Sequence, residues 1–356
     1  MIRIVQWTTG NVGTQTLLAT LRQPGLELVG CYAWSEEKQG KDVGSLVGID
    51  PIGIEATANI DALLALKPDC VCYTPIWPDI DHLCQILEAG INVATSTHFI
   101  TGHGYFGSER RQRIEAACKR GDSSILGSGM HPGFSNLMAL TAANACNRVD
   151  KIVITESQNA SGYASADTQR SVGFDLPIDT PELTEMLRDG SLVFVDGLHM
   201  MADALEVSID EVRFEADFAA AAQDTDLGFM KIHQGHVGGV AGRWHGYVDG
   251  QLMFDVGFRW IMGGPVTKPW PIEHAYLLEV QGMPTLKLRM EIHPPPDFKA
   301  RSPEDYMKLG MVITGLPVVN AIPALCEAPS GIRTYADLRL TTAAGFAAPA
   351  SAGRGA

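Results

Sequence analysis

The chain has 356 residues, 46% of them hydrophobic and 19% charged, which excludes disorder over the whole length and allows a large buried core. Its 41 Asp and Glu residues outnumber the 27 Lys and Arg residues, giving a net charge of −14. This sign is wrong for a protein that binds nucleic acid or an anionic membrane surface, so both are excluded as partners.

The first part of the chain alternates short apolar runs, typical of strands, with longer amphipathic runs, typical of helices. Strands are expected at 2–7, 26–33, 69–73, 92–95 and 123–126, and helices at 12–22, 60–66, 80–89, 108–120 and 134–147. Ser108 is the expected N-cap of its helix, and Gly90 and Gly121 are expected to end theirs. Such alternation predicts an α/β fold class, with a Rossmann-type parallel sheet in an NAD(P)-binding domain at 1–148.

After residue 148 the pattern changes to shorter alternating runs. These runs lie at 151–157, 243–247, 251–260, 275–280 and 286–292. The dipeptides Asp249-Gly250 and Gln281-Gly282 separate neighbouring runs and predict hairpins. Helices are expected at 181–189, capped by Thr180, and at 198–205. The second domain is therefore expected to be α+β, with an antiparallel sheet.

The remaining boundaries follow from composition. We expect the second domain, for substrate binding or dimerisation, to cover 149–300. A helix within 301–340 is expected to follow the Pro294-Pro295-Pro296 break and to pack back on the other domains. The low-complexity residues 341–356 are expected to form a disordered tail.

Cysteine usage, the N-terminal residues and the length of apolar stretches indicate the cellular compartment of the protein. The seven cysteines include no C-x-x-C pair and are expected to be buried, reduced thiols. The N-terminal residues run directly into a predicted strand and lack the regions of a signal peptide. No apolar stretch approaches the roughly 18 uncharged residues that a membrane helix needs. Together these features predict a cytoplasmic protein.

The strongest motif is a strand that runs into a glycine turn and then into a helix, at residues 4–13. It matches G-x-G-x-x-G with Thr8 in the first glycine position and Gly10 and Gly13 in the others. Gly10 would let the backbone approach a pyrophosphate, and Gly13 would let the helix pack closely on the strand. The expected cofactor contacts in the turn are Thr9, Gly10, Asn11, Val12 and Gly13. The alternative is a turn with only a structural role.

The end of the next strand bears on which dinucleotide binds. An acidic residue usually contacts the ribose of NAD there, and this chain has Ala33. Ser35, with Lys38 or Lys41, could hold a 2′-phosphate, and Trp34 could cover the adenine or simply pack. Two glutamates in the same loop favour NAD instead. We predict NADP as the cofactor, with NAD possible.

Ligands of open α/β sheets bind beyond the carboxyl ends of the strands, so the loops there are candidate sites. Further cofactor contacts are expected at Thr74, Pro75, Thr95, Ser96, Pro132 and Gly133. His98, His103 and His131 place imidazoles in the same loops, and each is either a proton-transfer group or structural. Tyr163 and Lys231 are candidate donors from the second domain, or surface residues.

Two other site classes are disfavoured. His233-x-x-His236, with His245, lacks the helix-borne H-E-x-x-H pattern and a cysteine partner, so no metal is expected. No G-x-S-x-G motif is present, which disfavours a hydrolase of that class.

The chain resembles the dihydrodipicolinate reductase-like proteins, especially the branch with 2,4-diaminopentanoate dehydrogenase and the native amine dehydrogenases. The segments that carry the resemblance are 6–13, 27–30, 38–44, 89–93, 129–134 and 320–323. The resemblance implies a Rossmann domain, a second domain on a mixed or antiparallel sheet, and a homodimer. It also implies reversible NAD(P)-dependent reduction of C=O or C=N, with residues 132–134 near the nicotinamide.

Two departures from this family refine the expectation. Residues 156–162 lack the His-His pair, the Lys and the Ser-Gly-Thr loop with which the reductases hold a dicarboxylate, which disfavours lysine biosynthesis. The amine dehydrogenases carry a glutamate after the strand that ends here at Thr95-Ser96-Thr97, and this chain has His98-Phe99. A neutral imidazole stabilises an iminium less well than a carboxylate does, but it could protonate the alkoxide of a ketone.

We therefore predict an amine dehydrogenase-like oxidoreductase acting on a rather apolar amine or ketone, with His98, His131 and Tyr163 as the catalytic candidates. The first alternative is an NADPH-dependent ketoreductase or alcohol dehydrogenase with His98 as proton donor. The second is a non-catalytic NADP(H)-binding sensor.

Overall fold

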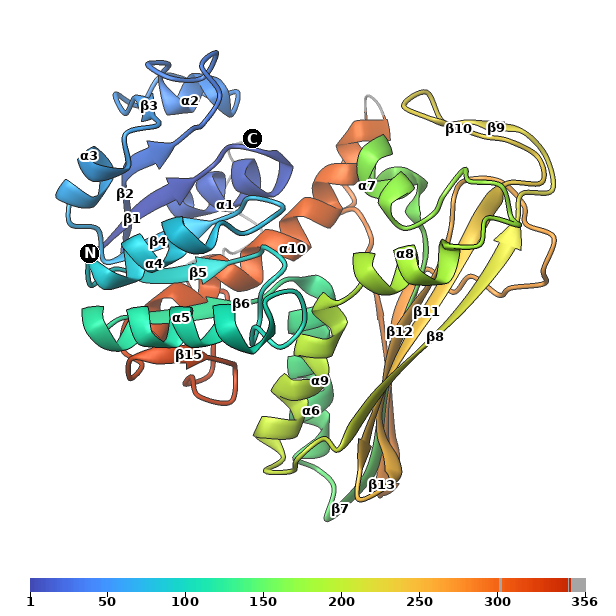
Figure 1. Cartoon of the computed structure of the whole chain (residues 1–356). Helices are drawn as coiled ribbons and strands as arrows, with labels where there is room; N and C mark the ends of the chain where they lie inside the picture. The colour runs from blue at the N-terminus through green and yellow to red at the C-terminus, as the bar shows by residue number, and fades with distance from the viewer. Residues whose placement is uncertain (301–302, 345, 347–356) are drawn as a thin grey trace. The chain divides into compact units, whose positions relative to one another are not determined.

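The computed structural model describes residues 1–300, 303–344 and 346, and the chain forms two compact units (Figure 1). Unit 1 comprises Met1–Met130 and Met311–Ala356, and unit 2 comprises His131–Gly310. The functional division expected at residue 148 stays a prediction. The expected disordered tail at 341–356 lies largely outside the described residues.

Unit 1 is built on a seven-stranded sheet in which every pair of neighbouring strands is parallel. Its strands are β1 (Ile2–Trp7), β2 (Leu26–Tyr32), β3 (Ala56–Thr57), β4 (Cys70–Tyr73), β5 (Asn92–Thr95), β6 (Ser124–Gly127) and β15 (Gly331–Arg333). The strand order is β15-β6-β5-β4-β1-β2-β3. From β1 the chain adds β2 and β3 on one side, and it then adds β4, β5 and β6 on the other side, as in a Rossmann sheet. The predicted fold class is confirmed.

Helices pack against both sides of this sheet, which explains why its strands are apolar without alternation. They are α1 (Asn11–Arg22), α2 (Val43–Leu46), α3 (Ile60–Ala65), α4 (Ile80–Glu88) and α5 (Gly107–Gly121). A core cluster joins Val5, Val71 and Val93 of the central strands to Leu83 of α4 and Ile114 of α5. The sheet and its helices therefore form one rigid scaffold for the loops at the strand ends.

Two of the three predicted helix ends in unit 1 need correction. Gly90, with a φ of +79°, ends α4 as predicted. Ser108 is not an N-cap, because α5 begins one residue before it and has no side-chain cap. Gly121 lies inside α5, where an added Cβ would be 1.8 Å from the carbonyl oxygen of Leu87. Asp122, in the left-handed conformation, ends the helix instead.

Unit 2 contains a six-stranded mixed sheet with helices packed on it (Figure 1). The strands are β7 (Arg148–Asn159), β8 (Glu211–Ala220), β11 (Val237–Val248), β12 (Gln251–Ile261), β13 (Ala275–Met283) and β14 (Leu286–Glu291), in the order β14-β13-β7-β12-β11-β8. The helices are α6 (Ser135–Ala143), α7 (Ala166–Ser171), α8 (Leu183–Gly190) and α9 (Val193–Ala204). Only β7 and β12 pair in parallel; a small ladder joins β9 (Thr225–Asp226) to β10 (Lys231–Ile232).

The hairpin predictions for unit 2 have mixed outcomes. Asp249 and Gly250 both have positive φ and join β11 to β12, as predicted. The turn expected at Gln281-Gly282 is wrong, because both residues pair with β7 inside β13. The chain reverses after Met283 instead. Thr180 caps no helix, since α8 begins at Leu183.

The last helix, α10 (Pro303–Leu325), corrects the expectation about membrane-length segments. Among the described helices it is the one with the length and composition of a membrane span, over Asp305–Leu325. Of that window, 44% is buried inside the protein, and core helices meet the same criteria. Gly315 of α10 lies so close to α1 that an added Cβ would be 2.7 Å from Thr16 Cγ2. This stretch of α10 is therefore part of the packing of unit 1.

Candidate functional site

The turn between β1 and α1 has the geometry of an anion-binding site. Thr8 occupies the first glycine position of the motif. Its φ of +79° is a conformation that favours glycine. Gly10 precedes α1 in extended conformation and provides no side-chain cap, so the first amide groups of the helix point to whatever lies in front of them. Asn11 and Val12 are the first two residues of α1.

The two motif glycines have different structural roles. An added Cβ at Gly13 would lie 2.4 Å from the Thr8 carbonyl oxygen and 2.7 Å from Thr74 Oγ1. A Cβ at Gly10 would meet nothing within 4 Å. Gly13 is therefore required for the fold of the turn, whereas the space in front of Gly10 is open.

A buried network beneath the turn centres on Gln6, a residue that sequence reasoning did not single out. Gln6 Nε2 donates to Thr74 Oγ1 at 3.0 Å and to the Thr8 carbonyl oxygen at 3.0 Å. Gln6 Oε1 accepts from Thr16 Oγ1 at 3.0 Å. Thr74 Oγ1 in turn donates to the Trp7 carbonyl oxygen. These bonds join β1, α1 and the end of β4, so the turn is held in one conformation.

The loop after β2 brings the predicted 2′-phosphate ligands to the same turn. Lys38 Nζ donates to Thr9 Oγ1 at 3.2 Å and lies 3.4 Å from the Thr9 carbonyl oxygen. Ser35 Oγ is buried and has no hydrogen-bond partner in the structure. Ala33 is buried, and Trp34 is 72% exposed, so its indole face is open. A phosphate or ribose oxygen would satisfy a buried hydroxyl that has no partner.

Asp42 holds the backbone of this loop in place. Its carboxylate accepts hydrogen bonds from the backbone amides of Gly44, Ser45, Ile52 and Gly53. Desolvation alone would raise the pKa of Asp42, but these four amides hold it below its ordinary value. A charged Asp42 thus fixes the backbone that follows Lys38.

The hydroxyls of Thr74 and Thr95, predicted as cofactor contacts at the ends of β4 and β5, have partners within the chain. Thr95 Oγ1 accepts from the Thr97 amide at 3.0 Å, and the Ser96 amide donates to the Tyr73 carbonyl oxygen at 3.2 Å. Pro75 is half-buried beside them. Thr74 and Thr95 therefore shape these loops, and their cofactor contacts stay predictions.

His98 lies in an aromatic cluster at the ends of the same strands. Its ring centroid is 4.7 Å from that of Trp77 and 5.2 Å from that of Tyr105. Ile76 and Trp77 are each 57% exposed, although they are large and apolar. An exposed apolar pair next to a half-buried imidazole is suited to an apolar ligand.

In unit 2, His131 is neutral and has partners at both nitrogens. Nδ1 lies 2.6 Å from Ser135 Oγ, and Nε2 lies 3.2 Å from the Gly257 carbonyl oxygen. Burial lowers the pKa of His131 to about 4, with the charge of Arg243 acting in the same direction. An imidazole in this state is a poor general acid near neutral pH.

The segment after His131 is held by the start of α6. Pro132 is buried, and Gly133 has a φ of +128°. The Gly133 amide donates to Asn136 Oδ1 at 2.8 Å, and Asn136 Nδ2 donates to the Gly197 carbonyl oxygen. The predicted cofactor contact at Pro132 and Gly133 thus rests on a rigid backbone and stays a prediction.

Glu156 of β7 is a half-buried acid that sequence reasoning did not single out. It pairs in register with Phe258 of β12 and with Tyr276 of β13. Burial raises its pKa to about 8, although the side chains of Trp260 and Tyr276 partly offset this. The sequence held a sign of this environment, because Glu156 shares its strand face with Ile152 and Ile154, both fully buried. At neutral pH Glu156 is largely a protonated acid.

Tyr163 and Lys231 complete the predicted donors of unit 2. Tyr163 is half-buried, and burial raises its pKa while Thr168 partly offsets the shift. Lys231 is exposed and lies 3.4 Å from Asp226 as an ion pair on the small ladder. Within the described residues, no hydrogen bond, ion pair or ring contact joins Tyr163 or Lys231 to Glu156.

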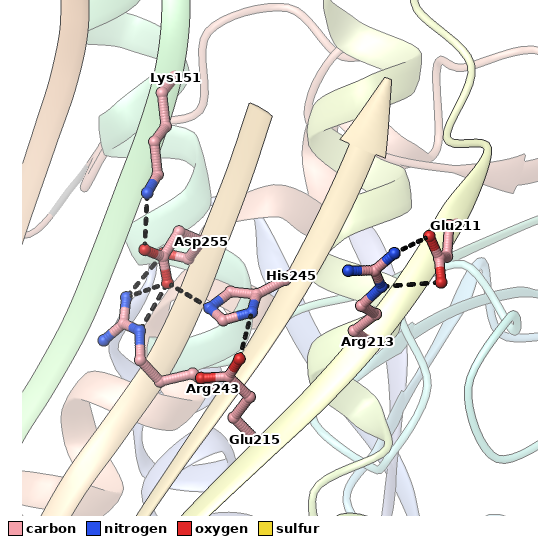
Figure 2. A network of polar contacts seen from close by, with 7 residues as sticks. All are labelled: Lys151, Glu211, Arg213, Glu215, Arg243, His245 and Asp255. Atoms are coloured by element: carbon pink, nitrogen blue, oxygen red, sulfur yellow. Dashed lines mark hydrogen bonds and ion pairs between the residues drawn. The ribbon is translucent and has the colours of Figure 1, made fainter. Parts of the chain in front are cut away.

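His245 belongs to a separate charge network on the sheet (Figure 2). Its Nε2 lies 3.3 Å from Asp255 Oδ1, and Asp255 also contacts Arg243 and, at 2.9 Å, Lys151. Burial would raise the pKa of Asp255, but the charges and hydrogen bonds of Arg243 and Lys151 lower it. This network satisfies half-buried charges between β7, β11 and β12.

The sequence of the chain matches a family model described as the 2,4-diaminopentanoate dehydrogenase C-terminal domain, over residues 135–350. The chain belongs to this family. The resemblance predicted from the sequence motifs is confirmed.

Relatives align along almost the whole chain. An amine dehydrogenase of Streptomyces virginiae is 27% identical, with 97% of this chain and 98% of the relative covered. The 2,4-diaminopentanoate dehydrogenase of Acetoanaerobium sticklandii is 22% identical, with 95% and 93% covered. The solved structure of an amine dehydrogenase from Mycobacterium smegmatis shares the fold, with a TM-score of 0.78 and 18% identity over 96% of this chain and 97% of that one. The predicted enzyme class, an NAD(P)-dependent oxidoreductase, is confirmed.

Proposed function

We propose that the protein is an NADP-dependent amine dehydrogenase, which moves a hydride reversibly between the nicotinamide and a C=N or C=O carbon of a rather apolar substrate. The turn at residues 8–13 carries the proposal, because it offers uncapped helix amides in front of an open Gly10. Full-length similarity to an amine dehydrogenase supports the choice of substrate class.

The residues around the turn fit NADP. The backbone from Thr9 to Gly13 would hold the pyrophosphate, and the exposed face of Trp34 would cover the adenine. Ser35 Oγ and Lys38 would bind the 2′-phosphate, because one is a buried orphan hydroxyl and the other is a cation at the same turn. The buried Ala33 stands where NAD enzymes usually carry an acid, so no carboxylate at this end of β2 repels that phosphate.

Reduction also needs one proton for the substrate nitrogen or oxygen. We propose that Glu156 supplies it, since the raised pKa keeps its carboxyl largely protonated at neutral pH, and this chain has His98-Phe99 where the resemblance implies a glutamate. Its apolar surroundings keep the acid neutral until the substrate takes the proton. His131 then has a positioning role, whereas His98 and Tyr163 stay candidates for substrate contact.

The deciding experiment measures NADPH oxidation with a panel of apolar ketones, with and without ammonia. Turnover that requires ammonia supports the amine dehydrogenase, and amine oxidation with NADP is the matching reverse assay. Equal turnover without ammonia, lost in His98→Ala, would establish the ketoreductase alternative instead. Tight NADPH binding without turnover of any ketone or amine would establish the sensor.

The role of Glu156 has its own test. Glu156→Gln keeps the shape of the side chain but cannot release a proton, so kcat should fall about 100-fold or more. The affinity for NADPH, measured by fluorescence, should not change. Tyr163→Phe, which removes only a hydroxyl, is the comparison for the other candidate of unit 2. Wild-type kcat in Glu156→Gln would reject this role.

We also propose that the enzyme is a cytoplasmic homodimer. All seven cysteines are free thiols, which suits a reducing compartment. In unit 2, α6 and α9 lie on one face of the large sheet (Figure 1), and the opposite face carries the half-buried charges of Figure 2. A face of this kind suits contact with a second copy of the chain. Light scattering after size-exclusion chromatography tests the proposal, and a monomeric mass would contradict it.

A further inference from the structure

Three potential metal ligands meet in unit 2, far from Glu156 in the sequence. Asp175 follows α7, while His233 and His236 flank a tight turn after β10. The ligand atoms of the three residues all lie within 4.8 Å of one another. Folding therefore adds a carboxylate from a distant segment to an H-x-x-H pair.

The distances match those of ligands that share one tetrahedral ion. Asp175 Oδ1 lies 2.9 Å from His233 Nδ1 and 3.4 Å from His236 Nδ1. Two ligands each about 2.0–2.1 Å from Zn²⁺ are about 3.3 Å apart when the geometry is tetrahedral. The two imidazole centroids are 5.3 Å apart, close to the roughly 5 Å expected for two rings on one tetrahedral ion. Small side-chain rotations would thus complete the coordination.

The backbone around the three residues is fixed independently of any ion. The His233 amide donates to Asp175 Oδ1 at 2.9 Å, and the Asp175 amide donates to the Val237 carbonyl oxygen at 3.0 Å. The Val237 amide returns a bond to the Leu176 carbonyl oxygen. Positive φ at Asp175 and at Gly235, in the turn between the histidines, sets the direction of the two segments. A site that is arranged in advance costs little entropy to occupy.

The charge at this place also favours a cation. The Asp175 side chain is only 14% exposed, and its recorded ion-pair partners in the described part of the chain are the two histidines, with no lysine or arginine. The His233 and His236 side chains are 57% and 35% exposed, so an ion and a water ligand have access.

We propose that Asp175, His233 and His236 form a binding site for a divalent transition-metal ion of the zinc type, with water as the fourth ligand. Two imidazoles and one carboxylate select such ions over Mg²⁺ and Ca²⁺, which prefer oxygen ligands. The ion ties the segment after α7 to the loop after β10. His236 Nδ1 lies 2.8 Å from the Asp175 carbonyl oxygen, so metal binding at this nitrogen replaces that contact.

The test titrates Zn²⁺ into the full-length, tag-free and metal-free protein by calorimetry, in buffer with millimolar Mg²⁺. We expect one Zn²⁺ per chain and a higher unfolding temperature with Zn²⁺ than with EDTA. Asp175→Asn, and separately the double variant His233→Ala/His236→Ala, should lower the affinity at least about tenfold. His293→Ala is the matched control, because His293 is an exposed histidine 2.8 Å from a single carboxylate, Glu291.

Two results of this titration would reject the proposed metal site. If wild type binds no Zn²⁺, or if the double variant binds it as tightly as wild type, the proposed site is wrong. The double variant keeps the test decisive if Asp175→Asn fails to fold, because the two imidazoles are more exposed than the Asp175 side chain. Circular dichroism and NADPH binding of the variants in EDTA should equal those of wild type, which separates this site from the proposed enzyme function.

Discussion

Lys38 Nζ lies 3.2 Å from Thr9 Oγ1, so a cation from the loop after β2 sits directly at the glycine turn before α1. The two residues are 29 positions apart, and only the pairing of β1 with β2 brings them together. The cation that the sequence suggested for a 2′-phosphate therefore also lies within reach of the turn that would hold a pyrophosphate.

This position predicts the effect of removing the charge. Lys38→Ala should weaken NADPH binding about tenfold or more, because it removes a charge-assisted contact to phosphate. NADH binding should weaken less. Lys41→Ala is the control, since Lys41 is exposed and has no recorded contact with the turn. Fluorescence titration of both cofactors measures the four affinities, and an equal loss for NADH and NADPH would contradict the assignment of Lys38 to the 2′-phosphate.

The two motif glycines should respond differently to the same added methyl group. Gly10→Ala should keep the wild-type unfolding temperature but lose most NADPH binding, because its Cβ points into open space. Gly13→Ala should lower stability by about 1–3 kcal/mol, because its Cβ would overlap the Thr8 carbonyl oxygen. Thermal unfolding and cofactor titration together separate the two effects. A Gly10→Ala variant that binds NADPH normally would show that the turn is only structural.

Glu156 predicts a change in the pH dependence of stability. Its pKa is about 8 in the folded protein and near the ordinary value of 4.5 in the unfolded chain. Between these values the unfolded chain releases a proton that the folded protein retains, so stability falls as pH rises from about 4.5 to 8. Glu156→Gln, which stays neutral, should remove this fall. Urea unfolding at pH 5, 7 and 9 measures the free energy of unfolding of wild type and of Glu156→Gln. If both free energies change with pH in the same way, Glu156 is not a buried neutral acid.

The two ion-pair groups in Figure 2 should differ in their contribution to stability. Asp255 is only 14% exposed and lies between Lys151 and Arg243, so Asp255→Asn should cost about 2–4 kcal/mol by leaving half-buried cations unpaired. Glu211 and Arg213 are each more than half exposed, so Glu211→Gln should lower the free energy of unfolding far less than Asp255→Asn does. Chemical denaturation measures both, and equal effects would show that exposure does not decide them.

The lowered pKa of Asp255 predicts how its contribution to stability changes at acid pH. Its contribution is complete above the ordinary pKa of 3.8 and is lost as pH falls through the lower folded value. The stability difference between wild type and Asp255→Asn should therefore be present at pH 7 and shrink below about pH 4. A difference that stays constant into this range would contradict the ion-pair origin.

Local sequence patterns determined much of this protein. The alternation of apolar and amphipathic runs located five of the seven strands of the parallel sheet, missing β3 and β15, and Asp249-Gly250 located a hairpin, because both depend on residues close in the chain. The same kind of reasoning placed a turn at Gln281-Gly282, where pairing with β7 keeps the strand extended. It also missed β8, although the residues of that strand alternate regularly in exposure.

Tertiary structure decided the chemistry. Glu156 is an ordinary carboxylic acid in the sequence, and only the neighbouring strands and helices remove it from water and raise its pKa. Asp175 reaches His233 across 58 positions through long-range backbone bonds, which no local spacing encodes. The sequence by itself determined most strands of the parallel sheet and the glycine turn before α1, because those follow from short-range periodicity and glycine geometry. Which groups are buried, charged or brought together depends on contacts between distant segments, and those contacts exist only in the folded chain.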